Sequence, residues 1–244
     1  MIFEVCVDST AGVRAARAAE AARVELCADL LEGGVTPSRG MIQQARAIEG
    51  IGLHVIVRPR GGDFLYDDDE LAVIRSDIET IKDEGADGVV FGLLTAAGEV
   101  DAARTRELIS LARPLSVTFH RAFDMTRDPF HALDALIMLG VDRVLTSGQG
   151  ATALEGLPLI AELVRRAESR IVVMPGGGIG PGNIERIIAA AGPKEIHFAA
   201  FNPTVSGMEY RRLGVFMGGE LKPSEYDRLV TSTASVRGVI AAAG

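Results

Sequence analysis

Two copies of a Glu-x-Cys triplet stand near the N-terminus, at residues 4–6 and 25–27, each inside a short apolar run. Side chains alternate along a β-strand, so Glu4 with Cys6 and Glu25 with Cys27 should face the same way. Neighbouring strands lie about 4.8 Å apart, which could bring the two thiols close enough to share a soft ion such as Cu(I). A disulfide and a pair of small buried hydrophobic residues are the alternatives. The glutamates favour function, because carboxylates are rarely buried without a partner.

A segment with two arginines and an aspartate ends the third apolar run, at Arg58, Arg60 and Asp63. Arg58 has the strand parity of residues that should face inward, so it could bind the glutamates through bidentate hydrogen bonds. A structural salt bridge is the alternative. Arg60 is a candidate for binding an anion, and Asp63 should lie in the loop that covers the strand ends.

Three ionisable residues, His120, Arg121 and Asp124, cluster at the end of the fifth apolar run. Histidine titrates closest to neutral pH, so His120 is a candidate general acid or base. A lone histidine on a strand is more often structural, but its two charged neighbours favour the functional interpretation. His197 in the eighth run shares its parity with Glu195, and both are expected to face inward.

Hydroxyl and backbone donors follow the sixth and seventh apolar runs. Ser147 follows the sixth run, and Gly176, Gly177 and Gly178 stand between the seventh run and a helical segment. Exposed N–H groups of such a glycine loop could bind an anion. A tight turn that binds nothing is the alternative.

These residues recur at corresponding places because the chain alternates between two kinds of segment. Eight apolar runs predict strands at 2–7, 23–28, 53–58, 88–94, 115–119, 143–146, 170–174 and 195–200. Helical periodicity predicts helices at 10–22, 38–48, 67–84, 101–112, 128–139, 152–167 and 181–190. Eight such repeats predict an α/β fold, a (β/α)8 TIM barrel whose functional site lies at the carboxyl ends of the strands. An open doubly wound sheet fits less well, since no G-x-G-x-x-G follows the first run.

The 244 residues are expected to form a single TIM-barrel domain, 1–244. The barrel should span about 1–201 and a C-terminal extension about 202–244, with a helix from about 223 to 243. Gly85, Gly140 and Gly192 are predicted to end helices, where a left-handed residue is favoured. The acidic run at 67–70 is predicted to begin a helix, because negative charge is favourable there.

Charge and hydropathy narrow the expected partners. The chain has 25 basic and 33 acidic residues, a net charge of −8, which argues against nucleic acid or an anionic membrane as a general partner. No apolar run reaches the roughly 18 residues of a membrane-spanning helix. The N-terminus has no secretory signal, so we expect a cytoplasmic protein with its two cysteines reduced.

Motifs along nearly the whole chain resemble those of the copper-homeostasis CutC family. They are EVCVDS at 4–9, RVELC at 23–27, EGGVTPS at 32–38, RPRGGDF at 58–64, DGVVFGLL at 87–94, TFHRAFD at 118–124, LTSGQ at 145–149, GGG at 176–178, EIH at 195–197 and MEYR at 208–211. The resemblance implies a cytoplasmic TIM barrel that forms a homodimer or homotetramer. It also implies Cu(I) as a ligand of Cys6 and Cys27. Phe198 and two alanines stand where many members have serines, which removes hydroxyl donors from one half of a phosphate site.

Three functions remain open at this point. The first is a copper-handling protein, and the second is a barrel enzyme acting on a small anionic, sugar-like or phosphorylated metabolite. The third is a scaffold that binds no ligand at the strand ends. The candidate catalytic residues are Glu4, Glu25, Arg58, Asp63, His120, Arg121, Asp124 and His197. The candidate anion-binding residues are Arg60, Ser147, Gly176, Gly177 and Gly178.

Overall fold

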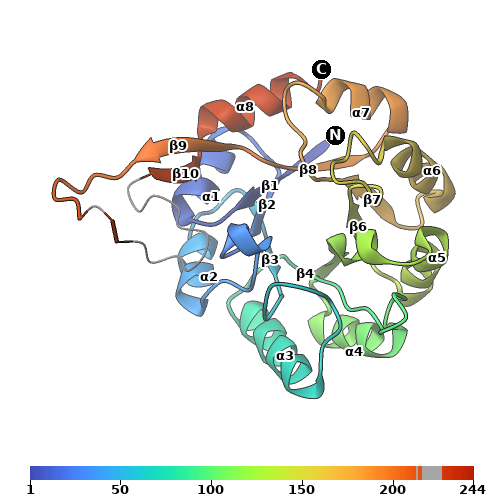
Figure 1. Ribbon diagram of the computed structural model, residues 1–244. Helices are drawn as coiled ribbons and strands as arrows, with labels where there is room; N and C mark the ends of the chain where they lie inside the picture. The colour runs from blue at the N-terminus through green and yellow to red at the C-terminus, as the bar shows by residue number, and fades with distance from the viewer. Residues whose placement is uncertain (213, 216–226) are drawn as a thin grey trace.

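Eight parallel strands form a nearly closed barrel in the computed structural model, which describes residues 1–212, 214–215 and 227–244 (Figure 1). The ladder runs β7-β6-β5-β4-β3-β2-β1-β8, so the described strands pair all round except between β7 and β8. The strands are β1 (Ile2–Val7), β2 (Arg23–Leu26), β3 (Gly52–Ile56), β4 (Gly88–Phe91), β5 (Ser116–Phe119), β6 (Arg143–Thr146), β7 (Val172–Pro175) and β8 (Glu195–Ala199). The predicted strands and the predicted TIM barrel are confirmed.

Helices surround the strands, as Figure 1 shows. They are α1 (Thr10–Ala18), α2 (Arg39–Arg46), α3 (Asp68–Asp83), α4 (Ala102–Ala112), α5 (Pro129–Leu139), α6 (Leu157–Ala167), α7 (Ile184–Ala191) and α8 (Thr233–Ala241), with 3-10 turns η1 (Leu30–Glu32) and η2 (Arg121–Met125). The acidic run begins α3 through a reciprocal capping box of Asp67 and Glu70. Gly85, Gly140 and Gly192 follow helices with positive φ, as predicted.

The pleat of β1 and β2 sends alternate side chains into different surroundings. Val5, Val7 and Leu26 are fully buried in the large hydrophobic core, which also contains the inner faces of the helices. Cys6 and Cys27 belong to a separate small cluster with Ile56. The predicted parity is therefore confirmed, and the polar side chains of these strands lie inside the barrel.

The C-terminal extension differs from the prediction of one helix from about 223 to 243. Residues 223–226 lie outside the described part, and the next five form a strand, β10 (Asp227–Thr231). β10 pairs antiparallel with β9 (Phe201–Val205), and the two strands extend away from the barrel in Figure 1. Local periodicity missed this strand because its partner lies more than twenty residues earlier in the chain. The helical part is α8, which packs beside α1.

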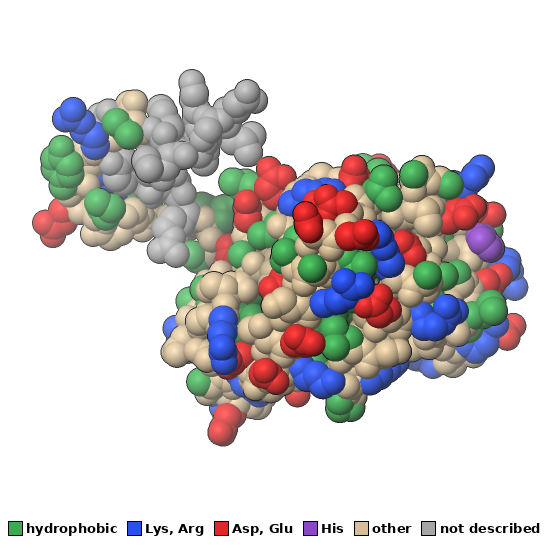
Figure 2. Space-filling model, turned by 90° about the horizontal axis from the view of Figure 1, so that it is seen from below, with side chains coloured by type: hydrophobic (Ala, Val, Ile, Leu, Met, Phe, Trp, Pro, Cys, Tyr) green, Lys and Arg blue, Asp and Glu red, His purple; other side chains and the backbone are tan. Residues whose placement is uncertain are grey.

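The outer surface carries both signs of charge. Figure 2 shows acidic and basic side chains interspersed over the visible face of the barrel. Among the described residues, no helix combines the length and the apolar character needed to cross a membrane.

Candidate functional site

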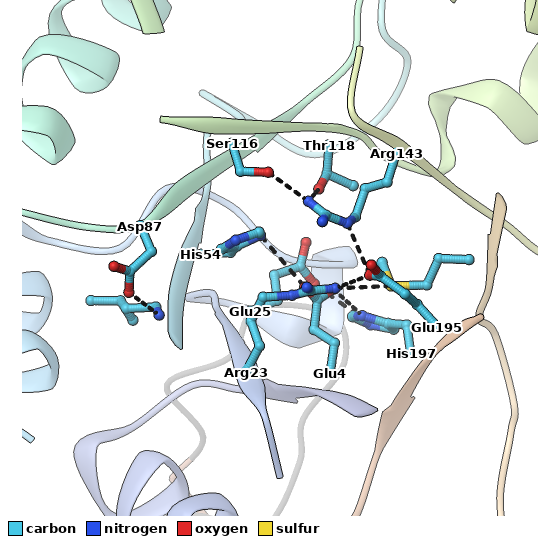
Figure 3. A network of polar contacts seen from close by, with 12 residues as sticks. Glu4, Arg23, Glu25, His54, Asp87, Ser116, Thr118, Arg143, Glu195 and His197 are labelled. Carbon is cyan, nitrogen blue, oxygen red and sulfur yellow. Dashed lines mark hydrogen bonds and ion pairs between the residues drawn. The ribbon is translucent and has the colours of Figure 1, made fainter. Parts of the chain in front are cut away.

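A layer of buried charges crosses the barrel interior near the amino ends of the strands, where Arg23, Arg143 and Glu195 begin β2, β6 and β8. The register places Glu4 level with Arg23 on β2 and with His197 on β8. Arg23 donates to Glu4 and, over 2.5 Å, to Glu195. Arg143 reaches the same Glu195 oxygen over 3.0 Å, and the dashed lines of Figure 3 show both arginines meeting this carboxylate. Each of these charges thus has an opposite charge beside it, which offsets the cost of burial.

Ser116, Thr118 and His54 extend this layer. Arg143 donates to Ser116 over 2.8 Å and to Thr118 over 3.2 Å. His54 lies 3.6 Å from Glu4, and burial lowers its pKa to about 4, so its ring is neutral at pH 7. We call Glu4, Arg23, Arg143 and Glu195, with Ser116 and Thr118, the interior network.

The two predicted metal ligands lie one pleat further toward the carboxyl ends of the strands. Their sulphur atoms are 3.8 Å apart, and both thiols are buried and free. A carboxylate oxygen of Glu25 lies within 4.8 Å of both sulphurs. Three donor atoms therefore converge on one point, and the sequence prediction that these side chains come together holds.

The hydrogen bond between the two thiols shifts their pKa values in opposite directions. A hydrogen bond from Cys27 lowers the pKa of Cys6 against the effect of burial, and His197 lowers it further. The same contact, together with burial, raises the pKa of Cys27. Burial raises the pKa of Glu25 to about 8. Cys6 is therefore the thiol of the pair that ionises more readily, and a thiolate is the form that binds metals.

His197 connects the thiols to the interior network. Its Nδ1 lies 2.9 Å from Glu4 and its Nε2 lies 3.6 Å from Glu25. Burial opposes protonation of this ring, but hydrogen bonds with Cys6 and Glu4 raise its pKa well above the usual value. The imidazolium is thus held by the Glu4 carboxylate on one side and lies beside Cys6 and Glu25 on the other.

A cavity of about 320 Å³ opens at the carboxyl ends of the strands and reaches this cluster. Its polar lining includes Cys6, Glu25, Arg58, His120, Arg121, Asp124 and His197, and its apolar lining includes Ile56, Phe64 and Leu145. Seven of the ten residues predicted as catalytic or metal-binding thus face one space. Glu4 and Cys27 are buried behind it, and only Asp63 lies apart from it.

The expected pairing of Arg58 with the inward glutamates is wrong. Its guanidinium donates to the carbonyls of Glu32, Gly34 and Gly62, over 2.6 to 3.0 Å, and so holds the loops after β2 and β3. Arg23, which is level with Glu4 in the register, takes the glutamate instead. Parity indicated only that Arg58 faces inward, whereas the register decides which carboxylate an arginine reaches.

Asp124 and Arg121 stabilise the loop that follows β6. Asp124 accepts hydrogen bonds from the backbone N–H of Ser147 and Gln149 and from the Thr146 hydroxyl. Arg121 donates to Asp124 over 2.8 Å and to the Ser147 hydroxyl over 2.7 Å. Both oxygens of the Asp124 carboxylate therefore already accept hydrogen bonds from within the protein.

The remaining predicted residues lie around the rim. Arg60 binds Glu70 and Asp63, whose side chain is 73% exposed, and neither Arg60 nor Asp63 lines the cavity. In the glycine loop, the carbonyl of Gly177 accepts from Ala153 and that of Gly178 accepts from Asn183. Gly177 has a φ of 103° and packs beside Ser147 and Arg121, where a larger side chain would be strained. Gly176 packs against Leu145 and His197.

Sequence reasoning did not select Arg23, Arg143 or Phe64. The two arginines begin predicted strands, at positions that share the inward parity of Glu25 and Leu145, and a charge inside a buried run was the available signal. Phe64 lies in a loop, where no periodicity indicates which way a side chain points.

Comparison with known proteins places the whole barrel in one family. The CutC family model matches residues 1–202. A mouse protein named copper homeostasis protein cutC homolog is 50% identical over 236 residues, which are 97% of this chain and 87% of that protein. A CutC family protein of Parabacteroides distasonis is 50% identical over 240 residues, 98% of this chain and 99% of that one.

Solved structures agree with these sequence matches. The crystal structure of a putative copper homeostasis protein CutC from Streptococcus agalactiae has a TM-score of 0.78 at 34% identity, covering 81% of this chain and 98% of that one. A phosphoribosylanthranilate isomerase from Pyrococcus furiosus has a TM-score of 0.57 at 13% identity, covering 100% of this chain and 98% of that one. The second likeness shows only the shared barrel fold.

Proposed function

We propose that this chain, which belongs to the CutC family, binds one cuprous ion between Cys6 and Cys27 and serves copper homeostasis as a low-capacity carrier or sensor. The observation that carries the proposal is a buried, unbridged pair of thiols with sulphurs 3.8 Å apart. The name of the mouse relative supports the link to copper. The chain has only two cysteines, which is too few for a storage protein.

The spacing of the sulphurs fits a shared ion. Transition metals bind thiolate sulphur at about 2.3 Å, as zinc does, so two sulphurs on one ion lie at most about 4.6 Å apart. The 3.8 Å between Cys6 and Cys27 falls inside that limit. Both cysteines can therefore hold one ion without a shift of β1 against β2.

The donor atoms favour a soft ion. Thiolates select Cu(I), whereas carboxylates suit hard cations such as Mg²⁺ or Ca²⁺. Glu25 is the third nearby donor, but burial raises its pKa to about 8, so we assign binding to the two sulphurs and leave Glu25 as a neighbour that is protonated at neutral pH. Cys6 lines the cavity and Cys27 lies behind it, which gives the ion a path from the mouth of the barrel.

Anaerobic titration of the reduced protein against a chromophoric Cu(I) chelator tests the proposal. We expect one equivalent of Cu(I) to bind with thiolate-to-copper absorption in the near ultraviolet. Cys6→Ser and Cys27→Ser should each weaken binding at least about a hundredfold, because each removes half of the soft ligand set. The double variant should show no thiolate-to-copper band.

Two methionines provide the matched controls. Met125 lines the cavity, and Met138 is 87% exposed on the outside, so each offers a soft sulphur outside the thiol pair. Met125→Leu and Met138→Leu should bind Cu(I) like the parent. A double cysteine variant that binds copper as tightly as the parent would contradict the proposal, and a large loss in Met125→Leu would show that the ligand set is wrong.

A further inference from the structure

Two buried N–H groups at the cavity have no partner among the described residues, and neither takes part in the thiol pair. His120 is 5% exposed, and its Nδ1 accepts the backbone N–H of Ala122 over 3.2 Å. Burial, together with the charge of Arg58, lowers the pKa of His120 to about 3, so the ring is neutral and carries its hydrogen on Nε2. That Nε2 has no hydrogen-bond acceptor in the described part of the chain.

Arg58 supplies the second unpartnered donor. Its two terminal nitrogens are used by loop carbonyls, and the Tyr66 hydroxyl interacts with the same guanidinium, but its buried Nε has no acceptor in hydrogen-bond geometry within that part. Buried polar groups are normally hydrogen-bonded, and those that are not call for an unseen partner. Since both orphan atoms are donors, their partner must be an acceptor.

The ring of Phe64 joins the two donors into one site. The Arg58 guanidinium carbon lies 5.2 Å from the ring centre, and the centre of the His120 ring lies 5.0 Å from it. All three residues line the 320 Å³ cavity, with Ile56 and Leu145 as further apolar walls. The volume is at the small end of the usual range for ligand pockets. An occupant thus meets these two donors at one side and the apolar surface of Phe64, Ile56 and Leu145 at another.

The charges around the cavity favour no more than one negative charge on the occupant. Its cationic lining residues are Arg58, Arg121 and His197, but Glu32, Asp124 and Cys6 line it too, so the surplus of positive charge is small. Asp124 is engaged with Arg121 and with backbone N–H groups. A carboxylate offers two oxygens, which matches two donors. A phosphate dianion would bring more charge and more acceptor atoms than these two N–H groups can satisfy.

We propose that the cavity binds a small organic carboxylate, whose oxygens accept hydrogen bonds from His120 Nε2 and Arg58 Nε and whose apolar part packs against Phe64. This site is separate in chemistry from the thiol pair and needs no metal. Neither the family name nor the names of the relatives assign it.

Calorimetric titration of the full-length reduced protein at neutral pH, in a buffer without carboxylate or phosphate, tests the proposal. The probes are benzoate, phenylacetate and pyruvate, with benzamide as the uncharged counterpart of benzoate and phenyl phosphate as the dianionic one. We expect at least one carboxylate to bind at millimolar concentration or below. Benzamide and phenyl phosphate should bind at least about tenfold more weakly than benzoate, since they lack the matching charge.

His120→Asn is the sharpest variant, because asparagine keeps an acceptor for the Ala122 N–H while it removes the Nε2 donor. It should weaken carboxylate binding about tenfold or more, the usual effect of losing a hydrogen bond to a charged group. His131→Asn makes the same change on the exposed face of α5 and should bind like the parent. Arg58→Lys keeps the charge and removes Nε–H, and should also weaken binding, with Arg75→Lys on the outer surface as its control.

Several outcomes would overturn the proposal. They are binding of none of the carboxylates at millimolar concentration, tighter binding of phenyl phosphate, or parent-like affinity in His120→Asn. Cys27→Ser changes the thiol that lies behind the cavity and, titrated without copper, should keep the affinity of the parent. A loss in that variant would assign the binding to the thiol pair instead, so the failure of this site and of the copper site can be told apart.

Discussion

The interior network and the mouth of the barrel are built from similar residue types but differ in how completely they are paired. In the interior network, Arg23 and Arg143 both donate to Glu195, and Arg23 also holds Glu4. At the mouth, two buried donors are left without an acceptor: Nε2 of His120 and Nε of Arg58 have no partner within the described residues. Buried charges that are paired hold the strands together, whereas buried N–H donors without an acceptor are available to a ligand.

His197 shows how the two regions depend on each other. It binds Glu4 on the network side and lies next to Cys6 and Glu25 on the mouth side. Changes in the network should therefore affect stability first and ligand binding second. Changes at the mouth should do the reverse.

The largest expected effect comes from breaking the network with Arg23→Met. This substitution removes the cation that Glu4 and Glu195 share, and it leaves two buried carboxylates with fewer partners. Removing one member of a buried ion pair costs about 3–5 kcal/mol of unfolding free energy. Urea unfolding of the variant and the parent measures the loss.

Arg75→Met is the matched control for that variant. Arg75 also binds a carboxylate, that of Glu107, but on the outer surface between α3 and α4, where water screens the pair. Its loss should change stability only slightly. If the two variants were equally stable, the interior network would not support the barrel, and the contrast between the two regions would fail.

The fold could be predicted because the signals that determine it are local. Each strand is a short apolar run and each helix has its own periodicity and cap, as Ser9 shows by accepting the Gly12 N–H at the start of α1. β10 was missed because only its pairing with β9 makes it a strand.

The site was predicted less completely for a related reason. Strand parity correctly brought Cys6, Cys27 and Glu25 to one point, because parity is a property of one strand. It could not show that Arg23 rather than Arg58 binds Glu4, since that depends on the offset between β1 and β2. Nor could it place Phe64, whose position follows from the path of a loop.

An effect of intermediate size is expected in the pH dependence of stability, to which His120 at the mouth contributes. The pKa of His120 is about 3 in the folded protein, below its ordinary value of 6.5, so the unfolded chain takes up the proton first as the pH falls. His120 therefore contributes stability that is present above pH 6.5 and is lost toward low pH, at about 1.4 kcal/mol per pH unit. Between pH 6.5 and about 4.5, the parent should lose about 2.3 kcal/mol more than His120→Asn does.

Urea unfolding at the two pH values measures this difference in slope. His54, whose pKa of about 4 covers part of the same window, is present in both proteins and cancels in the comparison. His131→Asn should keep the parental slope. A His120→Asn slope equal to that of the parent would mean that folding does not lower the pKa of His120, and that its surroundings at the mouth do not exclude the charged ring.

The smallest expected effect distinguishes two arginines that are two residues apart in the sequence. Arg58→Gln removes a buried cation from three loop carbonyls and should cost about 1–3 kcal/mol, because those acceptors are left unsatisfied. Arg60 also donates to loop carbonyls and to the carboxylates of Asp63 and Glu70, but its side chain is 38% exposed, so water can replace it, and Arg60→Gln should cost about 0–1 kcal/mol. Carboxylate binding should fall in the first variant only, since Arg60 does not line the cavity. If both variants lost binding equally, Arg60 would belong to the carboxylate site, and the site would extend from the cavity to the rim.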